Sequence, residues 1–442
     1  MLPRASAAGG TADDTGAPAG RRRWLLPVML ALFFTWGLAT VLVDIITPKL
    51  KSLFALSYAE ATLTQFCFFL AYAIVSLPAG LLVARIGYIR GLVLGLVVMA
   101  LGGLMFTPAA RMGVYPLFLL ALFVMASGIA VLQVAANPLV TKLGPAAQAP
   151  SRLTLAQTFN ALGTTVGPAI GAWAILSRGP ATPPDPAALS PEALAAARQA
   201  EAAVLQAPFL VIAGGLIGLA VLFWCLRSWM REEGGARPAQ GLGLDLLARP
   251  RLALGALAIF LYVGAEVAIG TLMVSYLEQP RVLAADPATA GHLLSVYWGG
   301  ALVGRVVGSV VLRYVRAGAA LAACALAAGL LATVSAVSDG PLAAWTLLAV
   351  GLANAIMFPT IFALAIDGLG ERTAQGAGIV CVAIVGGAVV PVVTGLLADR
   401  IGLSPALGAP VMCYLCIAGY ALANLREGAR TPESEPARSL AA

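Results

Sequence analysis

The chain has 442 residues, of which 60% are hydrophobic and 11% are charged, and its formal net charge is +7. Soluble domains carry about 25% charged residues, so this composition excludes an ordinary soluble protein and predicts a membrane protein. The positive charge does not indicate nucleic-acid binding, because most Lys and Arg residues flank long apolar runs, as they do in membrane topologies. The expected surroundings are therefore a lipid bilayer, with no nucleic acid as partner.

Twelve apolar runs follow one another along the chain, most of them near the length of about 20 residues that a bilayer-spanning helix needs. Such runs are too long for the roughly 10-residue alternating strands of a membrane barrel, so we predict an all-α membrane protein. The runs cover residues 24–46, 61–84, 91–106, 116–141, 153–176, 207–226, 252–277, 293–312, 318–337, 343–366, 374–398 and 407–425.

The basic residues are distributed unequally between the two ends of these runs. If the N-terminus is inside, one face carries most of the 27 Lys and Arg residues, including the cluster at 21–23. This positive-inside pattern predicts a multi-pass protein of the inner membrane with both termini in the cytoplasm. The first run has the basic flank of a signal peptide, but it is longer, contains Asp44 and lacks an A-x-A cleavage site. We therefore expect it to be retained.

The runs divide into two sets of six at a charged segment, 227–251. Each half contains a Leu-Gly turn, beginning at Leu143 or Leu369, which leads through a Gly-rich helix to a Pro and follows a helix with an internal Pro. Internal repeats of this kind are typical of secondary transporters. The predicted organisation is a cytoplasmic tail (1–22), a six-helix bundle (23–229), a linker (230–250), a second six-helix bundle (251–426) and a tail (427–442).

Two carboxylates lie within the apolar runs, Asp44 on the first run and Glu266 on the seventh. A charged side chain at the bilayer centre costs about 2.5–3.5 kcal/mol on insertion scales, so it is rare without a function. In a cavity that alternates between wet and dry, burial favours the protonated form of an acid. Asp44 and Glu266 are therefore candidates for proton coupling; the alternative for each is a purely structural contact.

Polar and aromatic residues spaced four apart mark one face of the first, fourth, seventh and tenth runs. Residues at this spacing share a helix face, and these runs are the first helix of each three-helix repeat, so we predict that they line a central cavity. The pairs are Thr40 with Asp44, Gln133 with Asn137, Tyr262 with Glu266, and Asn354 with Phe358; Gln157 and Asn160 on the fifth run and Trp36 on the first complete the set.

The predicted cavity is rich in neutral amides and aromatic rings. Amides both donate and accept hydrogen bonds, and rings cover the apolar face of a pyranose, so the expected partner is a small neutral sugar. An anionic substrate would require a buried cation, and we interpret Arg305 as lying at the cytoplasmic end of its helix, where it reaches the interface or anchors a loop. The sequence contains no ATP-binding, hydrolase or metal-ligand pattern, so we expect neither an enzyme nor a metal or organic cofactor.

Motifs on nearly every run resemble the fucose/glucose/galactose permease family of the major facilitator superfamily. Three of them are FFTWGLATVLVDIITPKLK from Phe33, LAQTFNALG from Leu155 and FPTIFALAI from Phe358. The resemblance implies twelve helices in two six-helix bundles around a central cavity, and proton-coupled import of a hexose by alternating access. It further implies that Asp44 is the family's coupling or sugar-binding acid and Asn160 its sugar-binding amide.

The resemblance favours the glucose/galactose branch, which shares Gln133 and Glu266, whereas the fucose branch has Glu in place of Gln133 and Tyr in place of Phe358. We therefore expect a monomeric glucose or galactose:proton symporter; fucose or N-acetylglucosamine as substrate and sodium as coupling ion are alternatives. A drug/proton antiporter is an alternative from another transport class, because residues 163–172 resemble the antiporter pattern. The buried Arg usual in such antiporters is missing. A sugar sensor without transport is a third hypothesis.

Overall fold

The structure is a computed structural model that describes residues 24–40, 58–112, 114–176, 191–228 and 241–428, and its regular elements there are all helical. After a first helix, Trp24–Thr40, the longer elements follow in chain order. They are α2 (Tyr58–Ile86), α3 (Tyr88–Met112), α4 (Tyr115–Lys142), α5 (Ala149–Leu176), α6 (Pro191–Leu226), α7 (Pro250–Leu277), α8 (Pro287–Val311), α9 (Ala317–Val337), α10 (Gly340–Asn354), α11 (Met357–Ile366), α12 (Thr373–Val382), α13 (Gly386–Ile401), α14 (Leu403–Ala406) and α15 (Gly408–Gly428).

Ten of the helical segments are long and apolar enough to cross a membrane by themselves. The first helix, which is shorter in its described part, and α5 add two more. α10 and α11 together make one crossing, and α12 and α13 another. The architecture of twelve membrane-spanning segments is thus the one expected from the apolar runs.

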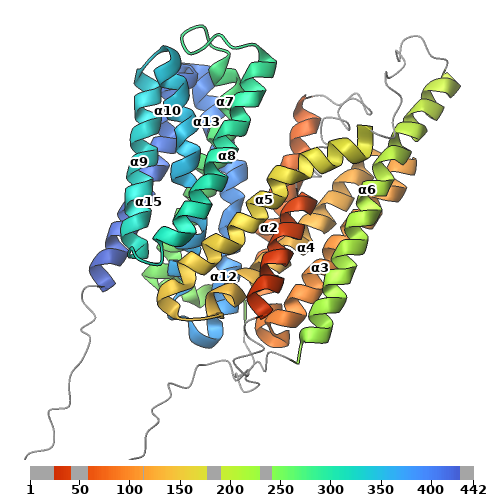
Figure 1. The fold of residues 1–442 in the computed structure, drawn as a ribbon, viewed down its shortest axis with the longest axis horizontal. Coiled ribbons are helices and arrows are strands. Elements are labelled where there is room, and N and C mark those ends of the chain that lie inside the picture. The colour runs from red at the N-terminus through yellow and green to blue at the C-terminus, as the bar shows by residue number, and fades with distance from the viewer. Residues whose placement is uncertain (1–23, 41–57, 113, 177–190, 229–240, 429–442) are drawn as a thin grey trace, which may run out of the picture.

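The helices form two bundles that lie side by side (Figure 1). In the first half α3 packs on α4 and α6, and in the second half α9 packs on α15 and α7 on α13. The predicted linker ends near the short 3-10 helix η3 (Leu244–Ala248), directly before α7. Residues 1–23, 229–240 and 429–442, which include most of the predicted tails and of the linker, lie outside the described residues.

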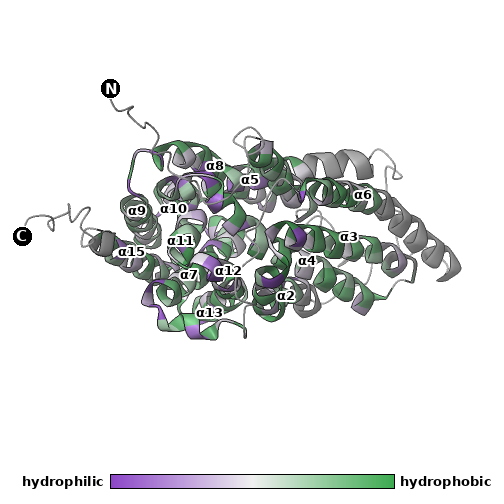
Figure 2. Cartoon of the chain, turned by 90° about the horizontal axis from the view of Figure 1, so that it is seen from below, coloured by the Kyte–Doolittle hydropathy of each residue, from purple (hydrophilic) through white to green (hydrophobic). Residues whose placement is uncertain are grey.

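The outward surfaces of the bundles are apolar, as a bilayer requires. Figure 2 shows mainly hydrophobic ribbon around the periphery, with hydrophilic positions between the bundles near α11 and α12. Large apolar side chains such as Leu101, Val211 and Leu330 are exposed. In hydrocarbon such exposure is favourable, because the surrounding solvent is itself apolar.

The two halves contact each other near the end that carries Arg85, Arg152 and Arg372, called the basic end below. There α2 crosses α12 closely, since a β-carbon added to Gly80 would lie 2.9 Å from the Ala374 carbonyl oxygen and 3.2 Å from Gly378 Cα. Small residues at such crossings allow backbones to pack directly in a membrane. A second crossing joins α5 to α8.

Helix interruptions divide the tenth and eleventh crossings. We predicted one continuous helix over 343–366, but α10 ends at Asn354 and α11 begins at Met357. Pro359 explains the position, because its ring clashes with the carbonyl of the residue four before it, Ala355. In the eleventh crossing, the 3-10 turn η5 (Ala383–Val385) separates α12 from α13.

Candidate substrate-binding site

A cavity lies between the two halves and is lined from both of them. Its volume is about 150 Å³. Residues from seven different crossings line it, so it is a central site. The lining residues are Trp36, Gln133, Gln157, Asn160, Tyr262, Val263, Glu266, Arg305, Phe358, Pro359 and Ile384.

The first half contributes neutral amides to this cavity. Gln133 of α4 is buried, and its Nε2 donates a hydrogen bond of 2.8 Å to the Tyr72 hydroxyl of α2. Its Oε1 has no hydrogen-bond partner among the described residues. Since Tyr72 holds one end of the amide, the other end is left as an acceptor for a ligand. Tyr72 itself was not predicted, because an isolated Tyr in an apolar run gives no spacing signal.

α5 contributes two further amides, Gln157 and Asn160, which lie close to the first helix. Asn160 Nδ2 donates to the Phe33 carbonyl at 3.1 Å. Gly37 packs directly on the backbone of Asn160, where a β-carbon would clash. This close approach places Trp36 and Asn160 on the same wall of the cavity, so the amide oxygen of Asn160 can accept a hydrogen bond beside an aromatic ring.

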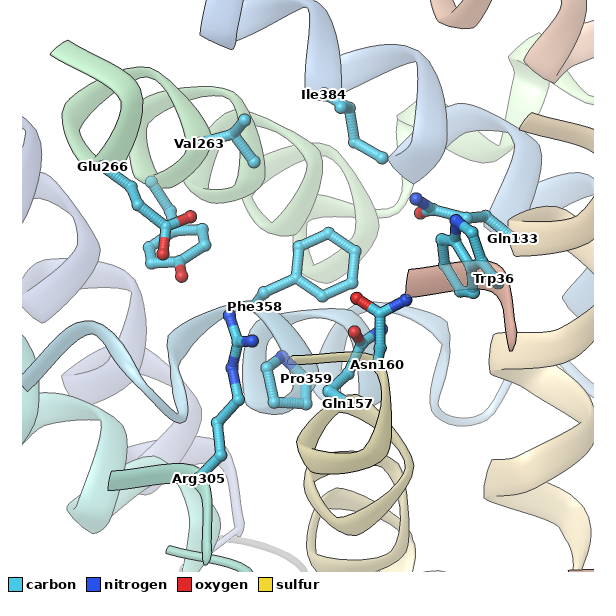
Figure 3. A pocket seen from close by; sticks show the side chains of 11 residues that line it. Trp36, Gln133, Gln157, Asn160, Val263, Glu266, Arg305, Phe358, Pro359 and Ile384 are labelled. Carbon is cyan, nitrogen blue, oxygen red and sulfur yellow. The ribbon is translucent and has the colours of Figure 1, made fainter. Parts of the chain in front are cut away.

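The second half contributes a pair of opposite charges and an aromatic ring. Glu266 of α7 and Arg305 of α8 both line the cavity, and Phe358 lies between these charged side chains and the amides of the first half (Figure 3). Glu266 Oε1 and Arg305 Nε are buried and make no hydrogen bond within the described part of the chain. Glu266 Oε1 and Arg305 Nε are therefore left to bond a ligand, while Tyr262 of α7 neighbours the Glu266 carboxyl.

Our interpretation of Arg305 as a residue of the helix end is wrong. α8 continues to Val311, which places Arg305 about 9 Å from the helix end at 1.5 Å per residue. The guanidinium instead lines the central cavity. The sequence did not show that this face of α8 turns toward the cavity, which residues of α7 and α11 also line.

Three predicted residues lie near the cavity but do not line it. Thr40 donates to the Trp36 carbonyl at 3.0 Å, within its own helix. Asn137 is fully buried inside the first half. Asn354 donates to the Tyr297 hydroxyl at 3.0 Å, and Tyr297 in turn donates to the Glu266 backbone carbonyl at 3.2 Å.

The remaining predicted residue, Asp44, lies outside the described residues. The structure thus brings seven of the predicted residues into one cavity: Trp36, Gln133, Gln157, Asn160, Tyr262, Glu266 and Phe358. Their roles in binding and coupling stay predictions. The prediction that Asn354 and Phe358 share the face of one continuous helix is wrong, because the break between α10 and α11 separates the two residues.

Comparison with known families identifies the fold. Residues 25–391 match the profile of the Major Facilitator Superfamily. The chain belongs to this superfamily. The expectation of a major facilitator fold with two six-helix bundles is confirmed, and the chain is a transporter rather than an enzyme.

Within the superfamily, the chain is similar to two sugar transporters by sequence. It is 48% identical over 363 residues to the glucose/galactose transporter of Brucella abortus, covering 82% of this chain and 84% of the relative. It is 34% identical over 378 residues to the L-fucose-proton symporter of Escherichia coli, covering 83% and 85%. The resemblance to the fucose/glucose/galactose permeases is therefore confirmed.

A solved structure of the superfamily shows the same architecture. The crystal structure of the transporter FucP in the outward conformation superposes with a TM-score of 0.84 at 32% identity, covering 91% of this chain and 99% of that chain. This similarity extends over both halves, so the relative arrangement of the two bundles is also alike.

Proposed function

We propose that this chain imports glucose or galactose across the inner membrane by proton symport. The observation that supports it best is the chemistry of the central cavity. Amides from the first half and a balanced Glu266–Arg305 pair from the second give a site with many hydrogen-bonding groups and no excess of positive charge. Hydroxyl groups both donate and accept, so a neutral sugar suits such a lining better than an anion does.

The choice of sugar rests on both the relatives and the cavity. The Brucella abortus relative, named a glucose/galactose transporter, is more similar to this chain than the L-fucose-proton symporter of Escherichia coli is. Gln133 supports the same choice, because the resemblance implies Gln at this position in the glucose/galactose branch and Glu in the fucose branch. Fucose and N-acetylglucosamine remain alternative substrates to be measured.

The bundle contacts support an outward-facing state with the basic end in the cytoplasm. α2 with α12 and α5 with α8 close the halves together at that end, and Ser151 Oγ donates to the Ser309 carbonyl across the second crossing at 2.5 Å. Positive charge favours the cytoplasmic side of a membrane. With this orientation, we propose that both termini lie in the cytoplasm and that the monomer is the functional unit.

Proton coupling requires an acid whose charge opposes closure of the cavity. We assign this role to Asp44, with Glu266 as the second candidate, because a carboxylate is rare in a membrane span without a function. When the cavity closes, protonation of the acid removes a charge that would be costly to bury. Sodium would replace the proton as coupling ion only if uptake followed a sodium gradient.

Reconstituted protein tests this proposal directly. Proteoliposomes with an imposed pH gradient are expected to accumulate labelled galactose and glucose, and a protonophore is expected to abolish the accumulation. A sodium gradient without a pH gradient is expected to drive nothing. Extrusion of drugs without sugar flux would instead support the antiporter, and sugar binding without any flux would support a sensor.

A further inference from the structure

Glu266 and Arg305 form an unusual arrangement in the second half. They lie on consecutive helices and line the same cavity, yet the ion pairs found in the described part of the chain join other residues. Glu266 Oε1 and Arg305 Nε are both buried and unpartnered within that part. The two charges thus face one cavity without closing on each other.

Two buried charged groups without hydrogen-bond partners destabilise the protein unless a ligand satisfies them. A buried charge without hydrogen bonds is destabilising, and opposite charges usually relieve this by direct pairing. Here the Glu266 carboxylate and the Arg305 guanidinium form no ion pair with each other, and both line the cavity. A ligand group that both donates and accepts hydrogen bonds can satisfy each charge at once, and hydroxyl groups have this property.

We propose that Glu266 and Arg305 bind two neighbouring hydroxyl groups of the transported hexose. Glu266 accepts hydrogen bonds from the hydroxyl hydrogens, and Arg305 donates to the hydroxyl oxygens. This inference rests on the proposed function and assigns the second half its part in sugar recognition. It makes Arg305 a substrate-binding residue and gives Glu266 a part in sugar binding, with Asp44 as the first candidate for the coupling acid.

The surroundings of the pair determine how the sugar would lie. Phe358 projects beside the two charged side chains (Figure 3), so its ring can cover the apolar face of a pyranose whose hydroxyl edge meets the pair. The amides of Gln133 and Asn160 lie on the opposite wall and can bond hydroxyls on the other edge of the ring. A ligand carboxylate would meet Glu266 as well as Arg305, so the pair gives an acidic sugar no net electrostatic attraction.

The test compares sugars that lack single hydroxyl groups. Galactose and its 2-, 3-, 4- and 6-deoxy analogues are bound to detergent-purified wild type, Glu266→Gln and Arg305→Gln, and affinity is followed by quenching of tryptophan fluorescence. Hydrogen bonds to charged groups are strong, so wild type is expected to lose about tenfold or more in affinity for two analogues deoxygenated at adjacent positions. In each variant, discrimination against these same two analogues is expected to fall to about threefold or less.

Controls just beyond the ends of the same two helices separate sugar contact from general effects of charge. Glu278→Gln, just beyond the end of α7, and Arg313→Gln, exposed beyond the end of α8, remove the same charges outside the cavity and are expected to keep wild-type discrimination. Arg305→Lys keeps the charge but loses the planar fork, and is expected to bind galactose with intermediate discrimination.

The outcomes distinguish this inference from the proposed function. If wild type discriminates between deoxy sugars and the cavity variants show the same pattern, Glu266 and Arg305 do not touch the sugar and the inference fails while sugar transport stands. If wild type binds no hexose at all, the proposed function fails. If Glu266→Gln or Arg305→Gln does not fold, unchanged discrimination by Arg305→Lys at full affinity overturns the inference.

Discussion

Single hydrogen bonds set the direction of the amide groups in the cavity. The Gln133 amide can rotate in principle, but Tyr72 accepts from its Nε2 and so directs Oε1 elsewhere. The Phe33 carbonyl does the same for Asn160. Each amide therefore presents its oxygen in a defined orientation, which lowers the entropy lost when a ligand binds.

Removal of the Tyr72 hydroxyl should weaken sugar binding without emptying the cavity. In Tyr72→Phe, Gln133 loses the group that orients it, and one neutral hydrogen bond is worth about 0.5–1.5 kcal/mol. We expect the Kd for galactose to rise about twofold to tenfold. Tyr276→Phe is the matched control, because it removes a buried hydroxyl that bonds to Ser335 away from the cavity. An equal change in both variants would contradict the role of Tyr72.

Asp44 is expected to couple sugar flux to the proton gradient. Asp44→Asn keeps the size of the side chain but cannot take up or release a proton, so gradient-driven accumulation of galactose should be lost while some exchange across the membrane remains. Counterflow and accumulation in the same proteoliposomes measure both. Asp339→Asn, in an exposed ion pair with Arg281, serves as control. Normal accumulation by Asp44→Asn would exclude this residue from coupling.

The spacing of polar residues predicted which helix faces meet the cavity, but not which residues on each face reach it. A spacing of four predicts that two side chains share a face, but it does not show how far along the helix the cavity extends. Gln133 therefore lines the cavity, while Asn137, one turn further on the same face, is fully buried in the bundle. Arg305 shows the opposite error, because only the packing of α8 against its neighbours reveals which way its face turns.

Helix interruptions bring backbone irregularity to the cavity wall. Phe358 and Pro359 follow the break between α10 and α11, and Ile384 lies in the turn between α12 and α13. Broken helices in a membrane are tolerated where they border a cavity or are buried in protein. The apolar runs predicted both crossings but neither break, because hydropathy does not distinguish a continuous helix from an interrupted one.

The 3-10 helix before α7 is joined to the start of α12 by a pH-dependent contact. Arg372 donates two hydrogen bonds to the Asp245 carboxylate, at 2.5 and 2.6 Å. These bonds from Arg372 hold the pKa of the Asp245 carboxyl below its usual value. An acid whose pKa falls on folding stabilises the folded state at any pH above its unfolded-state pKa, which is about 3.9 for Asp. This contribution disappears as the pH drops through the lower pKa of the folded state.

Asp245→Asn should therefore lower thermal stability at neutral pH but not in acid. We expect its Tm to lie below that of wild type between about pH 5 and 8, and the difference to vanish below the folded pKa of Asp245. Differential scanning fluorimetry of the detergent-purified proteins across this pH series measures it. Glu371→Gln, on the same short turn as Arg372, is the control. A difference that persists in strong acid would assign the effect to something other than the charge of Asp245.

Alternating access requires that contacts between the halves break and re-form as a unit. Two crossings between the halves lie at the basic end: a close backbone crossing of α2 with α12, and a crossing of α5 with α8 that includes the Ser151–Ser309 hydrogen bond. Small residues make the first crossing possible, so its stability is sensitive to added volume. The sequence indicated two halves and their repeats, but which end is closed follows only from these tertiary contacts.

Gly80→Leu should shift the protein away from the state described here. The added side chain clashes with the α12 backbone at Ala374 and Gly378, and overpacking of about 1–3 kcal/mol changes the balance of two states about fivefold to 150-fold. The buried Ser309, replaced by Cys in a background without other cysteines, should then react faster with a thiol reagent from the cytoplasmic side. Gly218→Leu is the control, because nothing lies within 4 Å of its added β-carbon. Unchanged reactivity in Gly80→Leu would mean that the crossing of α2 and α12 does not hold the halves together.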